Sequence, residues 1–278
     1  DFAQAKETVK FIQDKKWNSA LKSASKVKDN EFRNLITWMY LKTTRNGASF
    51  SEYKNFIEQN NEYPRINRIR FLAEEKIYLR NNSPTSIINW FEKYPPLGGM
   101  GKIKLAEAYL EKGQNDKVQT LIKEGWKTAT ISKNDLGYYR AKFKKFIDSE
   151  DHIKRADYLA WEKKYWDLKR MLKYLPSDQR ALYNARQILM SNSYGVDNAI
   201  SKVPQYLKED PGLEFDRLRW RNRRGRLEGS LEILYRNSIK TEQQMVRPDK
   251  WWEQRESVVR SLIYKKRYKT AYKISSEH

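Results

Sequence analysis

The sequence has no cysteine and is poor in histidine, glycine and proline. Without cysteine the chain can form neither a disulfide framework nor a thiolate metal site. Its two histidines, His152 and His278, are too few for a histidine-rich zinc site, so we expect no metal and no cofactor. With 11 glycines and 8 prolines in 278 residues, turn residues are too sparse for an all-β fold with many tight turns.

Long apolar runs are also missing. No stretch approaches the roughly 18 apolar residues that a membrane-spanning helix needs. The chain shows no signal peptide, because its first residues are already amphipathic; if the protein is exported, its leader has been removed. The last helical pattern, over residues 268–275, has no polar capping helix after it, so we expect a chain truncated at its C-terminus.

Charge and aromatic residues, by contrast, are abundant. The formal net charge is +21, which favours anionic partners such as nucleic acid, anionic lipid or an acidic cell-wall polymer without choosing among them. The 9 tryptophans, 18 tyrosines and 10 phenylalanines argue against disorder. A mean hydropathy of −0.94 suits thin layers of helices that each bury one stripe.

Apolar residues recur at helical spacing along the whole chain and predict roughly sixteen helices joined by short loops. Residues 31–41 place Leu35, Trp38 and Leu41 on one expected apolar side. Ser49 is a predicted N-cap, Pro64 is predicted to open the next helix, and Ser83 with Pro84 is predicted to begin another.

One segment shows a repeat unit most clearly. Residues 102–111 and 116–123 predict two helices around a turn at Gly113, with a spacing typical of tetratricopeptide-like pairs. Similar pairs follow, and no stretch resembles a linker. We therefore predict an all-α fold: one domain, residues 1–278, built as a superhelical stack of antiparallel helix pairs (an α-solenoid), curved or U-shaped.

Several segments in a fixed order carry a family resemblance over about residues 90–278. They read YPPLGGMGKIKLAEAYLEKG, DHIKRADYLAWEKKYWDLKRML, VPQYLKEDPGLEFDRLRWRNRRGR, RPDKWWEQRESVVRSL and KKRYKTAYKISSEH. Together they resemble the N-terminal helical, U-shaped domain of soluble lytic murein transglycosylases. The resemblance implies a periplasmic bacterial protein that cleaves peptidoglycan glycan strands with a 1,6-anhydromuramyl product.

In that family a lysozyme-like domain follows the helices and carries the catalytic glutamate. The resemblance implies that this domain is not in the present chain. The only Glu-Ser pair in a comparable position, Glu256-Ser257, lacks the Gly-Leu-Met-Gln stretch expected after it. We interpret Glu256 as a solvated helix residue and predict no catalytic residue.

The candidate binding residues lie in two segments. The first supplies five arginines, with Arg217, Arg221 and Arg224 on one helix face and Arg219 and Arg223 on a neighbouring one. They could grip carboxylates of wall peptides, or they could pair inside the stack with Glu214, Asp216 and acidic residues of the next helix, the interpretation we favour.

The second segment holds Trp251 and Trp252, a candidate sugar-stacking pair. Adjacent helical residues point about 100° apart, so at most one could face a ligand.

Three other patterns have simpler structural interpretations. Asp151, His152, Arg155 and Asp157 are interpreted as the start of a helix, with Asp151 near its cap. The glycines of residues 98–101 lack the ending of a phosphate-binding loop and are predicted to turn into a helix. Glu74 and Glu75 are interpreted as neighbours on a polar helix face.

The sequence thus predicts a non-catalytic scaffold that shapes substrate access or binds peptidoglycan or another anionic wall polymer. It could also contact the missing catalytic domain or a cell-wall protein. Two alternatives stay open at this point: a tetratricopeptide-like protein-interaction module, and a helical-repeat nucleic-acid binder. No nucleic-acid recognition motif is present, which makes the last of these the weakest.

Overall fold

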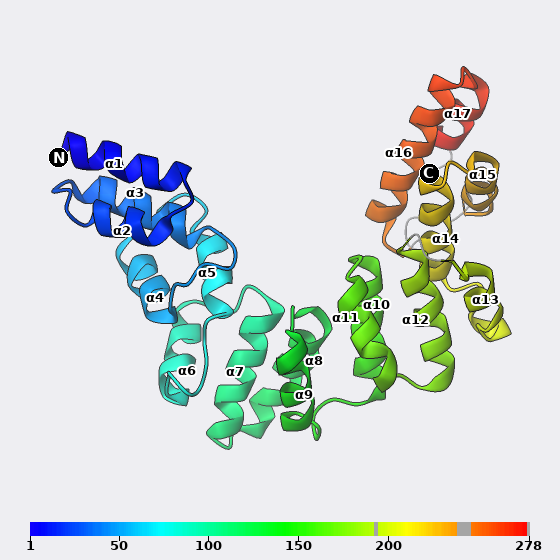
Figure 1. The fold of residues 1–278 in the computed structure, drawn as a ribbon. Coiled ribbons are helices and arrows are strands. Elements are labelled where there is room, and N and C mark those ends of the chain that lie inside the picture. Colours follow the sequence, from blue (N-terminus) through cyan, green and yellow to red (C-terminus); the bar gives the residue numbers. More distant parts are fainter. Residues whose placement is uncertain (192–193, 238–245, 277–278) are drawn as a thin grey trace. The chain divides into compact units, whose positions relative to one another are not determined.

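A computed structural model describes residues 1–191, 194–237 and 246–276 of the chain (Figure 1). Within these ranges it has seventeen α-helices, two short 3-10 helices and no strand. The predicted all-α fold is confirmed. No helix in the described ranges is long and apolar enough to span a membrane. His278 lies outside the described residues.

The contacts divide the chain into two compact units, residues 1–131 and 132–278. The expectation of one curved superhelix over residues 1–278 stays a prediction. In the first unit, consecutive helices pack against one another from α1 to α5 and from α6 to α8, and α5 contacts α7. Its helices are α1 (Phe2–Gln13), α2 (Trp17–Ala24), α3 (Asn30–Leu41), α4 (Phe50–Gln59), α5 (Ile66–Glu74), α6 (Pro84–Lys93), α7 (Gly99–Glu111) and α8 (Asn115–Thr128).

In the second unit, α10, α12, α14 and α16 form a row in which each contacts the next. The helices of this unit are α9 (Lys133–Lys142), α10 (Ser149–Trp161), α11 (Tyr165–Met171), η1 (Leu172–Tyr174), α12 (Ser177–Leu189), α13 (Val196–Ser201), η2 (Gln205–Leu207), α14 (Pro211–Arg223), α15 (Leu227–Arg236), α16 (Pro248–Tyr264) and α17 (Tyr268–Ser276). Helix α14 lies against α10, α12, α15 and α16, so most of its surface is covered.

Five helix pairs share one kind of turn: α1/α2, α7/α8, α10/α11, α14/α15 and α16/α17. Each turn has three residues, and the middle one has a left-handed backbone with φ between 56° and 69°. These middle residues are Lys15, Gly113, Lys163, Gly225 and Lys266. The N–H of the next residue donates to a carbonyl five positions back at 2.8–3.0 Å, which is the Schellman motif. Such short turns make each pair an antiparallel hairpin, the predicted repeat unit.

The predicted caps are found where hydroxyl side chains precede helices. Ser49 and Glu52 form a reciprocal capping box at α4, and the Ser83 hydroxyl accepts from the N–H of Ser86 at α6. The expectation for Pro64 is wrong: α5 begins two residues later, after Arg65 has taken a left-handed backbone.

The expected apolar side of α3 is also wrong in part. The residues that α3 buries are Ile36, Tyr40 and Leu41. Leu35, by contrast, is 41% exposed. The spacing of apolar residues found the helix, but it did not identify which stripe meets α2 and α4.

Candidate functional site

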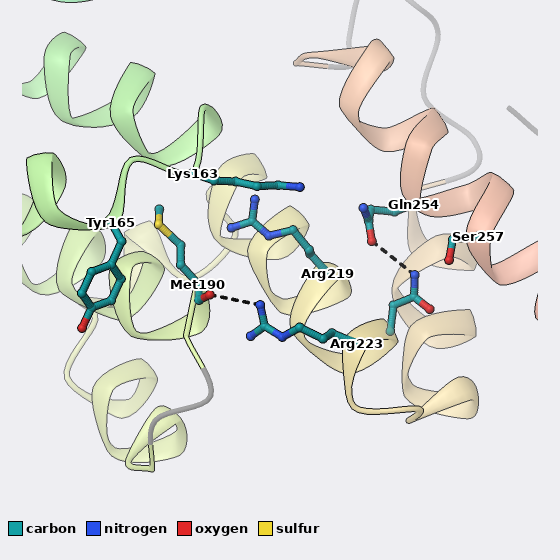
Figure 2. Close-up of a pocket in the computed structure, with 8 residues that line it drawn as sticks. Lys163, Tyr165, Met190, Arg219, Arg223, Gln254 and Ser257 are labelled. Carbon is teal, nitrogen blue, oxygen red and sulfur yellow. Dashed lines mark hydrogen bonds between the residues drawn. The ribbon is translucent and has the colours of Figure 1, made fainter. Parts of the chain in front are cut away.

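The second unit contains a pocket of about 350 Å³ in which cationic side chains gather (Figure 2). It lies beside the turn between α10 and α11, the end of α12, and facing sides of α14 and α16. Its lining residues are Lys163, Tyr165, Met190, Arg219, Asn222, Arg223, Gln254 and Ser257. Three of these carry positive charge, and none of these lining residues carries a carboxylate.

Helix α14 supplies Arg219, Asn222 and Arg223 because residues three and four positions apart share a helix face. The helix is fixed at its start by Pro211 in the first turn and by Asp210, whose carboxylate accepts from the N–H of Leu213 at 2.8 Å. This N-terminal anchoring sets the rotation of α14 and so directs the three side chains to the pocket.

Arg219 is the most buried cation of the lining, with 6% of its surface exposed. Its Nη2 forms an ion pair with Oδ1 of Asp216 at 2.8 Å, and neither of its buried terminal nitrogens has a hydrogen-bond partner among the described residues. Burial lowers the pKa of Arg219, against the opposing effect of Asp216. A buried guanidinium N–H without an acceptor is costly, and it is the kind of group that a ligand oxygen can satisfy.

Asp216 is shared with a second arginine, Arg186 of α12, and both are fully buried. Arg186 donates from Nε to Asp216 at 2.8 Å and from Nη1 to Asp157 of α10 at 2.8 Å. Burial alone would lower the pKa of Arg186, but these carboxylates outweigh it and raise the pKa. The close approach also requires Gly212, since a Cβ there would lie 2.3 Å from the guanidinium carbon of Arg186.

Arg223 is used differently from Arg219. Its Nη1 donates to the carbonyl of Met190 at 3.0 Å, and its Nη2 donates to those of Leu189 and Ser191 at 3.1 and 2.7 Å. These carbonyls belong to the C-terminal end of α12, where the helix dipole favours a cation. Arg223 therefore fixes the pocket wall and adds positive potential, while its terminal N–H groups are already engaged.

Lys163 is the third cation and stands in the turn between α10 and α11. Its left-handed backbone, φ 56°, turns the chain so that its side chain extends toward Arg219 (Figure 2). Partial burial lowers the pKa of Lys163, and the positive charge of the nearby Arg219 lowers it further. Across the pocket, the Gln254 side-chain oxygen accepts from the amide of Asn222 at 3.2 Å, so its own amide N–H groups remain as donors.

The other arginines proposed from the sequence lie outside this lining. Arg217 donates to Glu214 at 2.6 Å, and Arg221 donates to the carbonyl of Gly229 at 2.6 Å and to Glu232 of α15 at 3.0 Å. Arg224 is exposed, with its guanidinium 5.5 Å from the ring of Trp220. Of the five arginines, the structure thus brings Arg219 and Arg223 together at the pocket. Arg217 and Arg221 pair with glutamates of α14 and α15, as the favoured interpretation expected.

The two tryptophans separate as adjacent helical residues must. Trp251 is buried against Phe215, with ring centroids 5.5 Å apart, and belongs to the core of the second unit. Trp252 is 44% exposed and is not among the pocket residues. The structure does not bring the pair together as one sugar-stacking surface.

The other carboxylates and the histidine raised by the sequence take structural positions. Glu256 is exposed and accepts from Arg260 at 2.6 Å, one turn along α16. Asp151 belongs to a capping box, but the N-cap of α10 is Asp148. Burial lowers the pKa of His152, which lies against the ring of Tyr174. Among the described residues, no three His, Asp or Glu side chains cluster as metal ligands.

The interpretation of Glu74 as part of a polar helix face is wrong. Glu74 is buried in the first unit and accepts from the N–H of Leu97 at 2.5 Å and of Gly98 at 2.9 Å. Gly98 is the N-cap of α7, so the glycines do lead into a helix as expected. A Cβ at Gly101 would lie 2.5 Å from the Glu74 carboxyl, which explains the small residue there.

The sequence did not single out Lys163, Met190 or Gln254, and it raised Ser257 only beside Glu256, because these residues come from three separate elements. The left-handed backbone at Lys163 recurs in four other hairpins, but a lysine at this position gives no signal in the sequence.

Comparison with known proteins adds no relative: no family model, no curated protein and no solved structure matches this chain.

Proposed function

We propose that this chain is a non-catalytic helical-repeat module that holds an anionic cell-wall polymer, as the scaffold segment of a peptidoglycan lytic transglycosylase. The observation that supports the proposal best is the pocket lined by Lys163, Arg219 and Arg223. On this proposal the protein works in the periplasm, and bond cleavage belongs to a catalytic domain outside this chain.

The pocket fits this role because its cationic side chains can bind an anion directly, while the net positive charge of the whole chain attracts polyanions from a distance. A net charge of +21 attracts any polyanion and is screened by salt. A partly buried guanidinium such as Arg219 is screened less, and its interactions require an acceptor in the correct geometry. Wall peptides offer carboxylates at regular intervals along the glycan, so one polymer could engage both the general charge and the pocket.

Sedimentation with purified, insoluble peptidoglycan tests the proposal. We expect the chain to sediment with peptidoglycan at physiological salt and to release no anhydromuropeptides during incubation. The double variant Lys163→Gln/Arg223→Gln should remain in the supernatant to a much greater extent. The matched control is Lys164→Gln/Arg260→Gln, which removes the same charge from exposed positions outside the lining.

Three results would overturn the proposal. One is a chain that does not bind peptidoglycan, and another is the release of anhydromuropeptides by the purified chain. The third is a tight complex with RNA or DNA whose affinity falls linearly in log salt, because that is the behaviour of a phosphate-backbone binder.

A further inference from the structure

We infer that the pocket of the second unit is a subsite for a single carboxylate that carries a small apolar group. This is the ligand class offered by the C-terminal end of a short peptide. The inference rests on the proposed function in taking wall peptides as the source of this group. The pocket's donors, its charge and its apolar wall each support the assignment.

The donors that remain for a ligand are few. Arg219 offers its buried Nη1, which has no acceptor within the described residues. The Lys163 ammonium group makes no hydrogen bond or ion pair to the described part of the chain, and its side chain extends toward Arg219 (Figure 2). The terminal nitrogens of Arg223 are already bonded to the carbonyls at the end of α12. One oxyanion with two oxygens matches one guanidinium N–H and one ammonium group.

The charge of the lining also favours a monoanion. Asp216 lies 2.8 Å from Arg219 and offsets part of its charge. The carbonyls at the end of α12 offset part of the positive charge of Arg223. The Lys163 ammonium has no direct ion pair with a described residue, and Glu253 and Asp216 offset its charge only from a greater distance. A dianion such as phosphate would bring more negative charge than these partly offset cations balance.

The rest of the lining fits the aliphatic group and the peptide bond that lie next to such a carboxylate. Tyr165 and Met190 supply an apolar wall against which a small aliphatic group can pack. On the α16 side, the Gln254 amide and the Ser257 hydroxyl can donate to, or accept from, a peptide bond. A bare inorganic anion would leave the apolar wall unused.

Asp216 and Arg186 act behind the pocket as positioning residues. Asp216 holds Arg219 from one oxygen and Arg186 from the other, each at 2.8 Å. Arg186 is in turn bonded to Asp157, which lies on a third helix, α10. This chain of ion pairs fixes the guanidinium of Arg219 with one N–H group directed away from its partner, so a ligand finds the donor already in place.

The experiment measures binding of three small probes by calorimetric or NMR titration of the full chain. N-acetylalanine presents the carboxylate and methyl group, N-acetylalanine amide removes the charge, and inorganic phosphate removes the apolar part. We expect N-acetylalanine to bind, the amide to bind at least tenfold more weakly, and phosphate to displace N-acetylalanine only at much higher concentration.

Three variants locate the site. Lys163→Gln should weaken N-acetylalanine binding roughly tenfold, as expected for the loss of one charge-assisted contact. The matched control Lys164→Gln removes the same charge from the next, exposed residue and should change affinity less than twofold. Arg219→Lys keeps the charge but loses the fork geometry, and it should weaken binding while the helical circular dichroism is unchanged.

The results separate this inference from the proposed function. Equal losses in Lys163→Gln and Lys164→Gln, or phosphate binding as tight as N-acetylalanine, would overturn the carboxylate subsite. Peptidoglycan binding without any N-acetylalanine binding would overturn the subsite and leave the scaffold proposal standing. Binding of N-acetylalanine without peptidoglycan binding would overturn the scaffold proposal and leave the subsite standing.

Discussion

Two clusters of polar side chains, one in each unit, are bonded in different ways. In the first unit, Glu74 accepts from two backbone N–H groups, and the Asn46 amide donates to the carbonyls of Tyr40, Leu41 and Thr43 at 3.0–3.2 Å. In the second unit, Arg186, Asp216 and Arg219 are buried together and bond to one another. The first arrangement joins side chain to main chain, and the second joins side chain to side chain.

On the proposed function, this difference separates a structural role from a binding role. Main-chain partners lie in fixed loops and helix ends, so Glu74 and Asn46 hold the start of α7 and the loop after α3 in place. The arginine network has more N–H groups than its carboxylates accept, and the excess reaches the pocket at Arg219. A buried ion-pair network is weak evidence for stability, and the proposed subsite gives the surplus donor at its edge a ligand.

The largest effect should follow from removing the centre of this network. Arg186→Met leaves Asp216 and Asp157 without their shared cation, and loss of one partner from a buried pair costs about 3–5 kcal/mol. We expect that loss in the free energy of unfolding, measured by urea denaturation. The control is Arg180→Met, whose exposed guanidinium donates only to the Leu175 carbonyl. A loss for Arg186→Met no greater than that of the control would show that the network is dispensable.

A smaller effect should follow from replacing Glu74 in the first unit. The amide of Glu74→Gln places an N–H donor against backbone donors, so we expect a loss of about 1 kcal/mol at neutral pH. Glu75→Gln is the control, since Glu75 is the exposed neighbour.

Glu74 also predicts a pH dependence. Burial raises the pKa of Glu74, although the N–H groups of Leu97 and Gly98 oppose this. The folded chain thus holds this proton more tightly than the unfolded chain. This tighter proton binding stabilises the folded chain at pH values below the ordinary carboxyl pKa. The stabilisation is lost as the pH rises through the raised pKa of Glu74. Unfolding measured across this range should show the change in wild type and Glu75→Gln. The same slope in Glu74→Gln would show that another group causes it.

The sequence predicted the helices well because their signals are local. Ser49 with Glu52, and Ser83 with Pro84, are separated by no more than three residues, and such caps form whatever the rest of the chain does. The all-α class follows from the same local periodicity. The covered side of α3 depends on contacts with α2 and α4, and there the spacing of Leu35 and Trp38 misled the prediction.

The candidate site was harder to predict because its contacts are long-range. Arg186 and Asp216 are thirty residues apart, and nothing in either segment shows that they meet. The helical spacing of α14 separated Arg219 and Arg223 from the other arginines. It could not show that α14 is covered by four helices, which is why Arg219 is buried and Arg223 is tied to α12.

The hairpin turns carry a pattern that sequence reasoning could have used. The five turns read DKK, KGQ, EKK, RGR and KKR at residues 14–16, 112–114, 162–164, 224–226 and 265–267. Glycine at the middle position announces a left-handed residue, but lysine does not, because non-glycine residues rarely adopt it. Three of the five turns therefore carry no glycine signal, although helical periodicity predicts the helices that flank them.

The smallest effect concerns these turns and should be the same in both units. A left-handed backbone destabilises a non-glycine residue by about 1–2 kcal/mol. Glycine removes this strain, but it loses more conformational entropy on folding, which offsets about 0.5–1 kcal/mol of the gain. Lys15→Gly and Lys266→Gly should each stabilise the chain by about 0.5–1 kcal/mol in urea denaturation, while Gly113→Lys should destabilise it by a similar amount. Lys16→Gly, at a position with negative φ, is the control and should not stabilise. A gain for Lys266→Gly without one for Lys15→Gly would mean that the two units differ in their turns as well as in their buried polar groups, since the backbone geometry at both lysines is the same.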